Sequence, residues 1–154
     1  NRVLKEFLED YRLQDEPPYP TSLDLIERLK EATPDSLQYV INDVFESVTF
    51  YENKIESAKV GSKENGTYEV ELDFSIRKYA DGADKEFLPL NDCIEIGIYD
   101  KEEKLIHLKK YRTSSQKNKL RIKAERKPKR VIIDPNFLLI DKNIEDNKIE
   151  LSKF

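Results

Sequence analysis

The spacing of apolar residues changes once along the chain, from a helical period to a strand period, near residue 48. Before that point apolar side chains recur every three or four residues, which places them on one face of a helix. Beyond it apolar and polar residues alternate, which is typical of strands that cover a core with one face. The pattern therefore predicts a helical segment at 1–47 and a β-sandwich domain at 48–154.

Two short helices are predicted first. The apolar face of the first consists of Val3, Leu4, Phe7, Leu8 and Tyr11, and the helix ends before Pro17-Pro18, because the residue before a proline avoids helical backbone. Thr21 and Asp24 have the spacing of a capping box. The second helix begins there, with Leu23, Ile26 and Leu29 on one stripe.

A third helix has the longest apolar stripe of the segment. Thr33 is its predicted N-cap, and Pro34 stands at its first position, where a missing backbone N–H has no cost. The stripe consists of Leu37, Val40, Ile41, Val44, Phe45 and Val48.

The β region contains a series of short alternating stretches. We expect a first strand at 50–60, a hairpin turn at Asn65-Gly66, and a second strand whose apolar side is Tyr68, Val70, Leu72, Phe74 and Ile76. Further strands are expected around Ile94 to Ile98, Leu105 to Tyr111, Leu120 to Ala124 and Val131 to Ile133. About six to seven strands with two to three leading α-helices predict a mainly β fold, an immunoglobulin-like sandwich without the Cys and Trp pattern of antibody domains.

Composition narrows the class of protein. Charged residues make up 38% of the 154 residues, well above the usual quarter, which predicts a heavily solvated surface. The net charge of −4 argues against a nucleic-acid binder. No apolar run approaches the roughly 18 residues that span a bilayer. The chain contains no methionine, even at its start, and we expect it to be a soluble piece of a longer protein.

The residues offer little chemistry for an enzyme. A thermolysin-type zinc site needs two histidines one helical turn apart, and His107 is the sole histidine. We expect His107 to be a structural or surface residue of a strand, and the lone Cys93 to be a small core residue. No nucleophile has a paired base at a recognisable spacing. The chain is therefore predicted not to be an enzyme, without a metal or cofactor of its own.

Two acidic stretches are candidates for an ion site. Asp81, Asp84 and Glu86 surround Gly82 in a predicted loop, either as oxygen ligands of a cation such as calcium or as a solvated turn. Their spacing does not match an EF-hand. In the tail, Asp141 precedes Glu145, Asp146 and Asn147, and the same choice exists between a metal site and a turn that Asx side chains stabilise.

A basic stretch runs from Lys117 to Arg130. Its strand part alternates Lys119, Arg121 and Lys123 with apolar residues, as a half-buried strand requires. The alternatives are contact with anionic lipid or with an acidic protein. Nucleic acid is the least favoured partner because aromatic residues for base stacking are lacking.

Several segments together resemble a known bacterial family. They are Val3 to Arg12, Pro17-Pro18-Tyr19-Pro20-Thr21-Ser22, Ala32 to Tyr39, Ala80-Asp81-Gly82, Pro89-Leu90-Asn91-Asp92, Ile94-Glu95-Ile96-Gly97-Ile98 and the tail from Ile132 through Asp134-Pro135 to Asn147. In this order they resemble the carboxy-terminal region of membrane proteins that join an ABC-transporter permease to a zinc aminopeptidase-like region of the alanyl-aminopeptidase (gluzincin) family.

The resemblance implies a position rather than a reaction. In that family the zinc ligands and the catalytic glutamate lie upstream, so zinc is expected only in the parent, which the permease would place in the bacterial cytoplasmic membrane. We expect a non-catalytic accessory domain that packs against the peptidase-like region or another protein through Leu4, Phe7, Leu8 and Tyr11. The alternative is a β-sandwich module that binds calcium, peptide or glycan.

Overall fold

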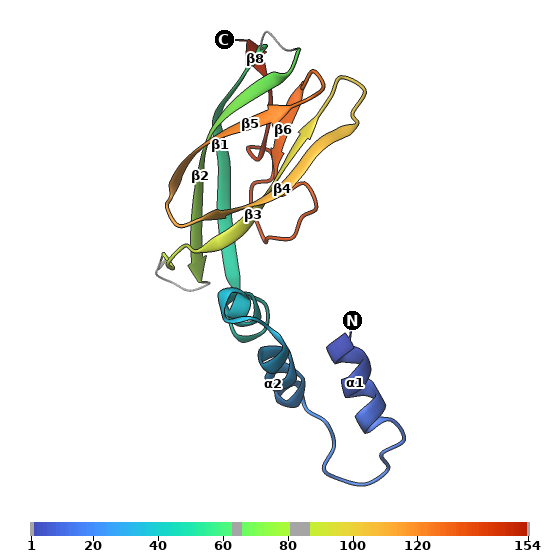
Figure 1. Cartoon of the computed structure of the whole chain (residues 1–154). Coiled ribbons are helices and arrows are strands. Elements are labelled where there is room, and N and C mark those ends of the chain that lie inside the picture. The colour runs from blue at the N-terminus through green and yellow to red at the C-terminus, as the bar shows by residue number, and fades with distance from the viewer. Residues whose placement is uncertain (1, 63–65, 81–86, 154) are drawn as a thin grey trace. The chain divides into compact units, whose positions relative to one another are not determined.

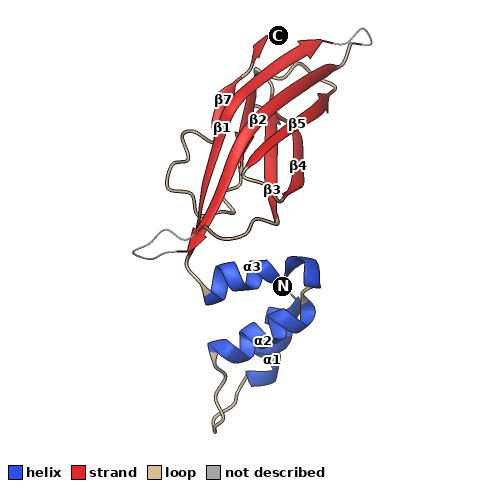
Figure 2. Ribbon diagram, turned by 90° about the vertical axis from the view of Figure 1, so that its left-hand side faces the viewer, coloured by secondary structure: helices blue, strands red, loops and turns tan. Residues whose placement is uncertain are grey.

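The computed structural model describes residues 2–62, 66–80 and 87–153. The chain divides into two compact units, Asn1–Val48 and Thr49–Phe154. The first unit is helical and the second consists of strands, as the colouring of Figure 2 shows. The mainly β fold with leading helices is therefore confirmed.

The first unit begins with α1 (Arg2–Tyr11) and α2 (Ser22–Ala32). The capping box predicted at the start of α2 is present. The backbone N–H of Thr21 donates to Asp24 Oδ2 at 2.7 Å, and the backbone N–H of Asp24 donates to Thr21 Oγ1 at 3.3 Å. These hydrogen bonds satisfy helix-end groups that have no partner within the helix.

The third helix differs from its prediction. In place of one regular helix the chain forms a 3-10 turn η1 (Asp35–Leu37), a single α-helical turn α3 (Gln38–Ile41) and a π-helical turn η2 (Asn42–Glu46). Thr33 is the C-cap of α2 rather than an N-cap, and its hydroxyl donates to the carbonyl of Leu29 at 2.6 Å. Pro34 explains this, because it keeps Thr33 in extended backbone and so ends the preceding helix.

The second unit is a sandwich-like pair of sheets (Figure 1). Its strands within the described residues are β1 (Thr49–Ser62), β2 (Tyr68–Ala80), β3 (Asp92–Tyr99), β4 (Leu105–Thr113), β5 (Lys117–Ala124), β6 (Arg130–Ile133), β7 (Lys148–Glu150) and β8 (Ser152–Lys153). One sheet has the order β5-β2-β1-β8, and the other has the order β4-β3-β6-β7. All pairs are antiparallel except β1 with β8.

The first two strands form the predicted hairpin. Ser62 lies opposite Tyr68, and Gly66 has the positive φ of 77° that a tight turn favours. Asn65 lies outside the described residues. A bulge between Ile55 and Ser57 adds one residue to β1, so the inward positions change from odd to even numbers along the strand.

The core lies between the two sheets. Inward positions of β2 and β3 alternate with outward ones as predicted, and they are fully or almost fully buried at Val70, Leu72, Phe74, Ile76, Ile94, Ile96 and Ile98. Cys93 falls between two inward positions, so it is half-buried on the other face of β3 and is not the core residue that we expected.

The segment 134–147 connects β6 to β7 and is the part of the sandwich that strand patterning did not anticipate. We call it the closing segment, because it pairs with the edge of β1 that β2 leaves open. The backbone N–H groups of Tyr51 and Ile55 donate to the carbonyls of Ile140 at 2.8 Å and Asp146 at 2.9 Å. The closing segment thereby joins both sheets. The strands that follow it, β7 and β8, each lie at the edge of one sheet.

Candidate functional site

The four residues expected to form an interaction face on α1 divide into two pairs. Phe7 is buried, and its ring lies 5.0 Å from that of Tyr11. Arg28 of α2 covers both rings, with its guanidinium carbon 5.6 Å and 5.7 Å from the two ring centres. Asp10 holds this guanidinium by an ion pair. Phe7 and Tyr11 therefore form the contact between α1 and α2.

Leu4 and Leu8 are the exposed pair. They lie one helical turn apart with 47% and 59% of their surface accessible. Together with Lys5, Glu9 and Arg12 they line a shallow hollow of about 380 Å³. Adjacent exposed leucines surrounded by charged side chains are typical of a surface that meets another protein.

Further apolar residues of the first unit are exposed beyond α2. Ile41 is buried, whereas its neighbours on the predicted stripe, Val40, Val44, Phe45 and Val48, are largely exposed. Only Ile41 of the predicted stripe is buried, and the segment forms 3-10, α-helical and π-helical turns in place of one regular helix.

The acidic loop offered as a weak ion site cannot be placed. Asp81, Asp84 and Glu86 all lie outside the described residues. Within the described ranges, no group of three or more His, Cys, Asp or Glu side chains is arranged to hold a metal ion.

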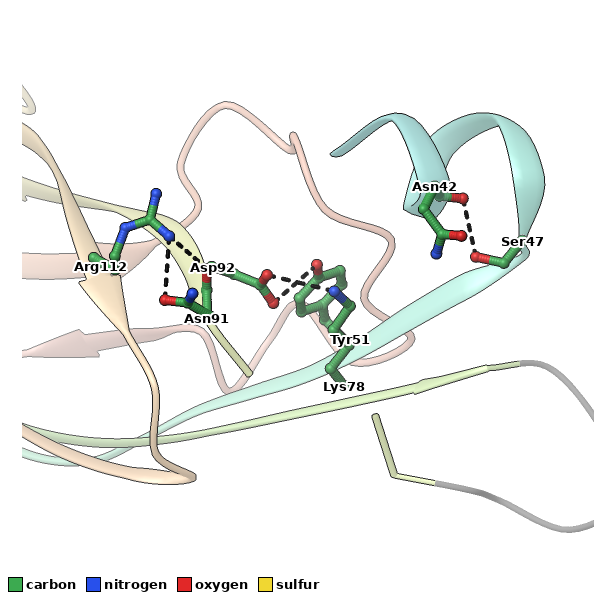
Figure 3. Close-up of polar contacts among 7 residues, drawn as sticks. All are labelled: Asn42, Ser47, Tyr51, Lys78, Asn91, Asp92 and Arg112. Carbon is green, nitrogen blue, oxygen red and sulfur yellow. Dashed lines mark hydrogen bonds and ion pairs between the residues drawn. The ribbon is translucent and has the colours of Figure 1, made fainter. Parts of the chain in front are cut away.

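A buried polar cluster joins the two sheets at one end of the core, as Figure 3 shows. Lys78 of β2 and Asp92 of β3 are only 5% and 2% exposed, and Lys78 Nζ lies 3.4 Å from Asp92 Oδ1. The hydroxyl of Tyr51 on β1 donates to Asp92 Oδ2 at 3.3 Å. A buried ion pair is tolerated when each charge has its partner and further hydrogen bonds. The cluster therefore connects three strands across the sandwich.

Sequence reasoning missed this cluster, although a pattern could have revealed it. Lys78 continues the inward series of β2 after Ile76, and Asp92 begins the inward series of β3 before Ile94. A lysine and an aspartate at core-facing positions of two strands predict that they meet, because neither is buried alone at tolerable cost.

The closing segment is organised by the carboxylate of Asp141. Its Oδ2 accepts hydrogen bonds from the backbone N–H of Asn53 at 2.9 Å and from Asn147 Nδ2 at 3.1 Å. Its Oδ1 accepts the backbone N–H of Asn143 at 3.0 Å. The carboxylate takes the place of a neighbouring strand's carbonyl beside Asn53. The turn stabilised by Asx side chains, one of the two readings of the tail, is thus present.

Burial shifts the pKa values of His107 and Tyr111 on β4. Burial lowers the pKa of His107, and the charge of Lys109 lowers it further. His107 Nε2 lies 3.0 Å from the hydroxyl of Tyr111, whose pKa is raised by burial. His107 is a half-buried strand residue, as expected, and its ring favours the neutral form.

Two basic residues of β5 have acidic partners on the neighbouring strand. Lys119 Nζ lies 3.3 Å from Asp73 Oδ1, and a guanidinium nitrogen of Arg121 lies 2.8 Å from Glu71 Oε1. Ile122 and Ala124 are buried on the opposite face. The strand has the predicted division into a charged side and an apolar side.

The described part of the chain contains no helix that is long and apolar enough to cross a membrane. No protein-family model, curated protein or solved structure matches the chain.

Proposed function

We propose that this chain is a non-catalytic accessory domain that docks onto another protein region through Leu4 and Leu8 of α1. The observation that carries the proposal is the exposure of these two leucines side by side in one hollow. Removing such a pair from water on docking favours association, because each buried leucine gains about 2 kcal/mol. The other two residues of the expected face, Phe7 and Tyr11, hold α1 against α2 and so keep the leucines in place.

The partner that we propose is the peptidase-like region that the sequence resemblance implies. The bacterial origin and the attachment to the cytoplasmic membrane through a permease belong to the same proposal and rest on the resemblance alone. The immunoglobulin-like arrangement is also a proposal, and the series of short strands supports it. Zinc and catalysis are assigned to the upstream region. In support of a non-catalytic role for this chain, the buried ionisable pair Lys78 and Asp92 joins the two sheets.

The test is a binding measurement between this chain and the separately purified peptidase-like region. Leu8→Glu places a charge in the hollow, and we expect it to weaken binding by about tenfold or more, because truncating or charging a central apolar contact costs over 1 kcal/mol. Leu23→Glu is the matched control, since Leu23 is an exposed leucine of α2 that does not line the hollow. Equal loss in both variants, or no binding by the unmodified chain, would reject docking through α1.

A further inference from the structure

Three buried oxygen atoms beside the closing segment have no hydrogen-bond partner. They are Asn53 Oδ1, Asn147 Oδ1 and Asp146 Oδ1. Asn53 and Asn147 are only 1% and 4% exposed. Buried polar atoms in folded proteins almost always have a partner in the protein, a water molecule or an ion. Asn53 Nδ2 is also without a partner, so this cluster of unpartnered atoms indicates that a water molecule or an ion belongs there.

The residues that bear these oxygens converge on one carboxylate. The backbone N–H of Asn53 and the side-chain N–H of Asn147 both donate to Asp141 Oδ2. Asn53, Asp141 and Asp146 also line one hollow of about 310 Å³. Asp141 lines a second hollow together with Asn147. Asn147 Nδ2 donates to Asp141 Oδ2, so Asn147 Oδ1, which belongs to the same amide group, lies near that carboxylate.

The charges of this region favour a cation. Asp141 and Asp146 both line the hollow of about 310 Å³. Three basic side chains line the same hollow, and each has a partner of its own. Lys54 Nζ lies 3.1 Å from Glu56 Oε2, Arg77 Nη1 lies 3.7 Å from Glu52 Oε2, and Lys142 Nζ lies 4.3 Å from the centre of the Phe50 ring. Two neighbouring carboxylates thus share a partly buried site in which a positive ion would reduce their repulsion.

We propose that Asp146, Asn53 and Asn147 bind a calcium ion through these oxygens, with Asp141 supplying negative charge and orienting both asparagines. Every proposed ligand atom is an oxygen, and oxygen ligands favour a hard cation over zinc or copper. Calcium fits better than magnesium, because it accepts irregular sets of carboxylate and amide oxygens and keeps some waters. The amide N–H group of Asn53 can donate to such a water.

The site differs from the acidic loop at Asp81, Asp84 and Glu86. It takes up the metal alternative that the sequence left open for the tail and adds Asn53 of β1. It is also independent of docking through α1, since it lies wholly within the sandwich unit. With two carboxylates and two amides we expect weak binding, with Kd in the range of about 0.1 to 1 mM that is common in extracellular modules.

The experiment measures thermal unfolding of the whole chain after chelator treatment, with calcium chloride or magnesium chloride added at equal ionic strength. We expect calcium at about ten times Kd to raise the Tm of the sandwich by about 5 °C, and magnesium to raise it less. Calorimetric titration with calcium chloride alone should give a stoichiometry of about one.

Asp146→Asn and Glu145→Gln form the matched pair of variants. Each removes one negative charge, but Glu145 is exposed and pairs with Lys148 at 2.7 Å. Asp146→Asn should abolish the calcium response while leaving the fold intact, because it also removes repulsion from Asp141. Glu145→Gln should keep the response. The proposal is overturned if calcium has no effect at about 10 mM, if Asp146→Asn responds like the unmodified chain, or if both variants lose the response equally.

Discussion

At the scale of single residues, His107 makes the stability of the sandwich depend on pH. Its pKa is lowered in the folded state by burial and by Lys109, so below the ordinary value of 6.5 the unfolded chain binds the proton more readily. The free energy of unfolding should therefore fall as the pH is lowered through that value, until the folded-state pKa is passed.

His107→Gln removes this contribution and keeps a polar group beside Tyr111. We expect a smaller loss of stability in the variant between about pH 7.5 and 5.5, measured by urea unfolding at both pH values. Comparison of the two proteins cancels the contribution of the carboxylates to the pH dependence, because they titrate in both. An identical pH dependence in the two proteins would show that the surroundings of His107 do not shift its pKa.

Thr21 is the residue on which the start of α2 depends. Thr21→Ala removes the hydroxyl that accepts the backbone N–H of Asp24, and should cost about 1 kcal/mol of helix stability. Far-UV circular dichroism of the chain would report this as a loss of helical signal. Thr21→Ser keeps the hydroxyl and should retain the signal, and a loss of equal size in both variants would mean that the cap is not responsible.

At the scale of the elements, the ion pair of Lys78 and Asp92 joins β2 to β3 through the core. Asp92→Leu alone leaves a buried lysine without its carboxylate, and should lower the free energy of unfolding by about 3–5 kcal/mol. The double variant Lys78→Met with Asp92→Leu should regain most of this loss, because paired apolar side chains of similar size replace such an ion pair at little cost.

Urea unfolding of the unmodified chain, both single variants and the double variant forms a complete cycle. Additive losses in the double variant would show that the two side chains do not stabilise each other.

The position of the closing segment depends on the carboxylate of Asp141. Asp141→Ala removes an acceptor of three hydrogen bonds, one from Asn53 of β1 and two from within the closing segment, and we expect a loss of about 3 kcal/mol. Glu145→Ala, a neighbouring acidic residue with an exposed side chain, should change stability by less than about 0.5 kcal/mol. Chemical denaturation without added metal distinguishes the two, and equal effects would assign the loss to charge alone.

At the scale of the whole molecule, the two units differ in how much apolar surface they bury. Residues 49–154 contain a continuous core between two sheets, whereas the first unit buries only Phe7 and Ile41 among its apolar side chains in the described part of the chain. We expect residues 49–154 to unfold cooperatively when expressed alone, as followed by circular dichroism in urea. A broad, non-cooperative transition would mean that the sandwich needs the helical unit.

The sequence by itself determined the elements whose patterns are local. The alternation in Tyr68 to Ile76 and Ile94 to Ile98 led to the correct buried faces, and the capping box at Thr21 and Asp24 marked the start of α2 correctly. Period and capping involve residues a few positions apart, so they can be identified without knowing the fold.

The tertiary structure decided the features that depend on distant partners. Apolar spacing at 37–48 predicted one helix, but Pro34 and the contacts of the unit produced three short turns. Asp141 meets Asn53 from 88 positions away, and Lys78 meets Asp92 across the sandwich. The physical reason is that a polar group is buried only where partners from other strands surround it, and those partners are set by sheet order and register.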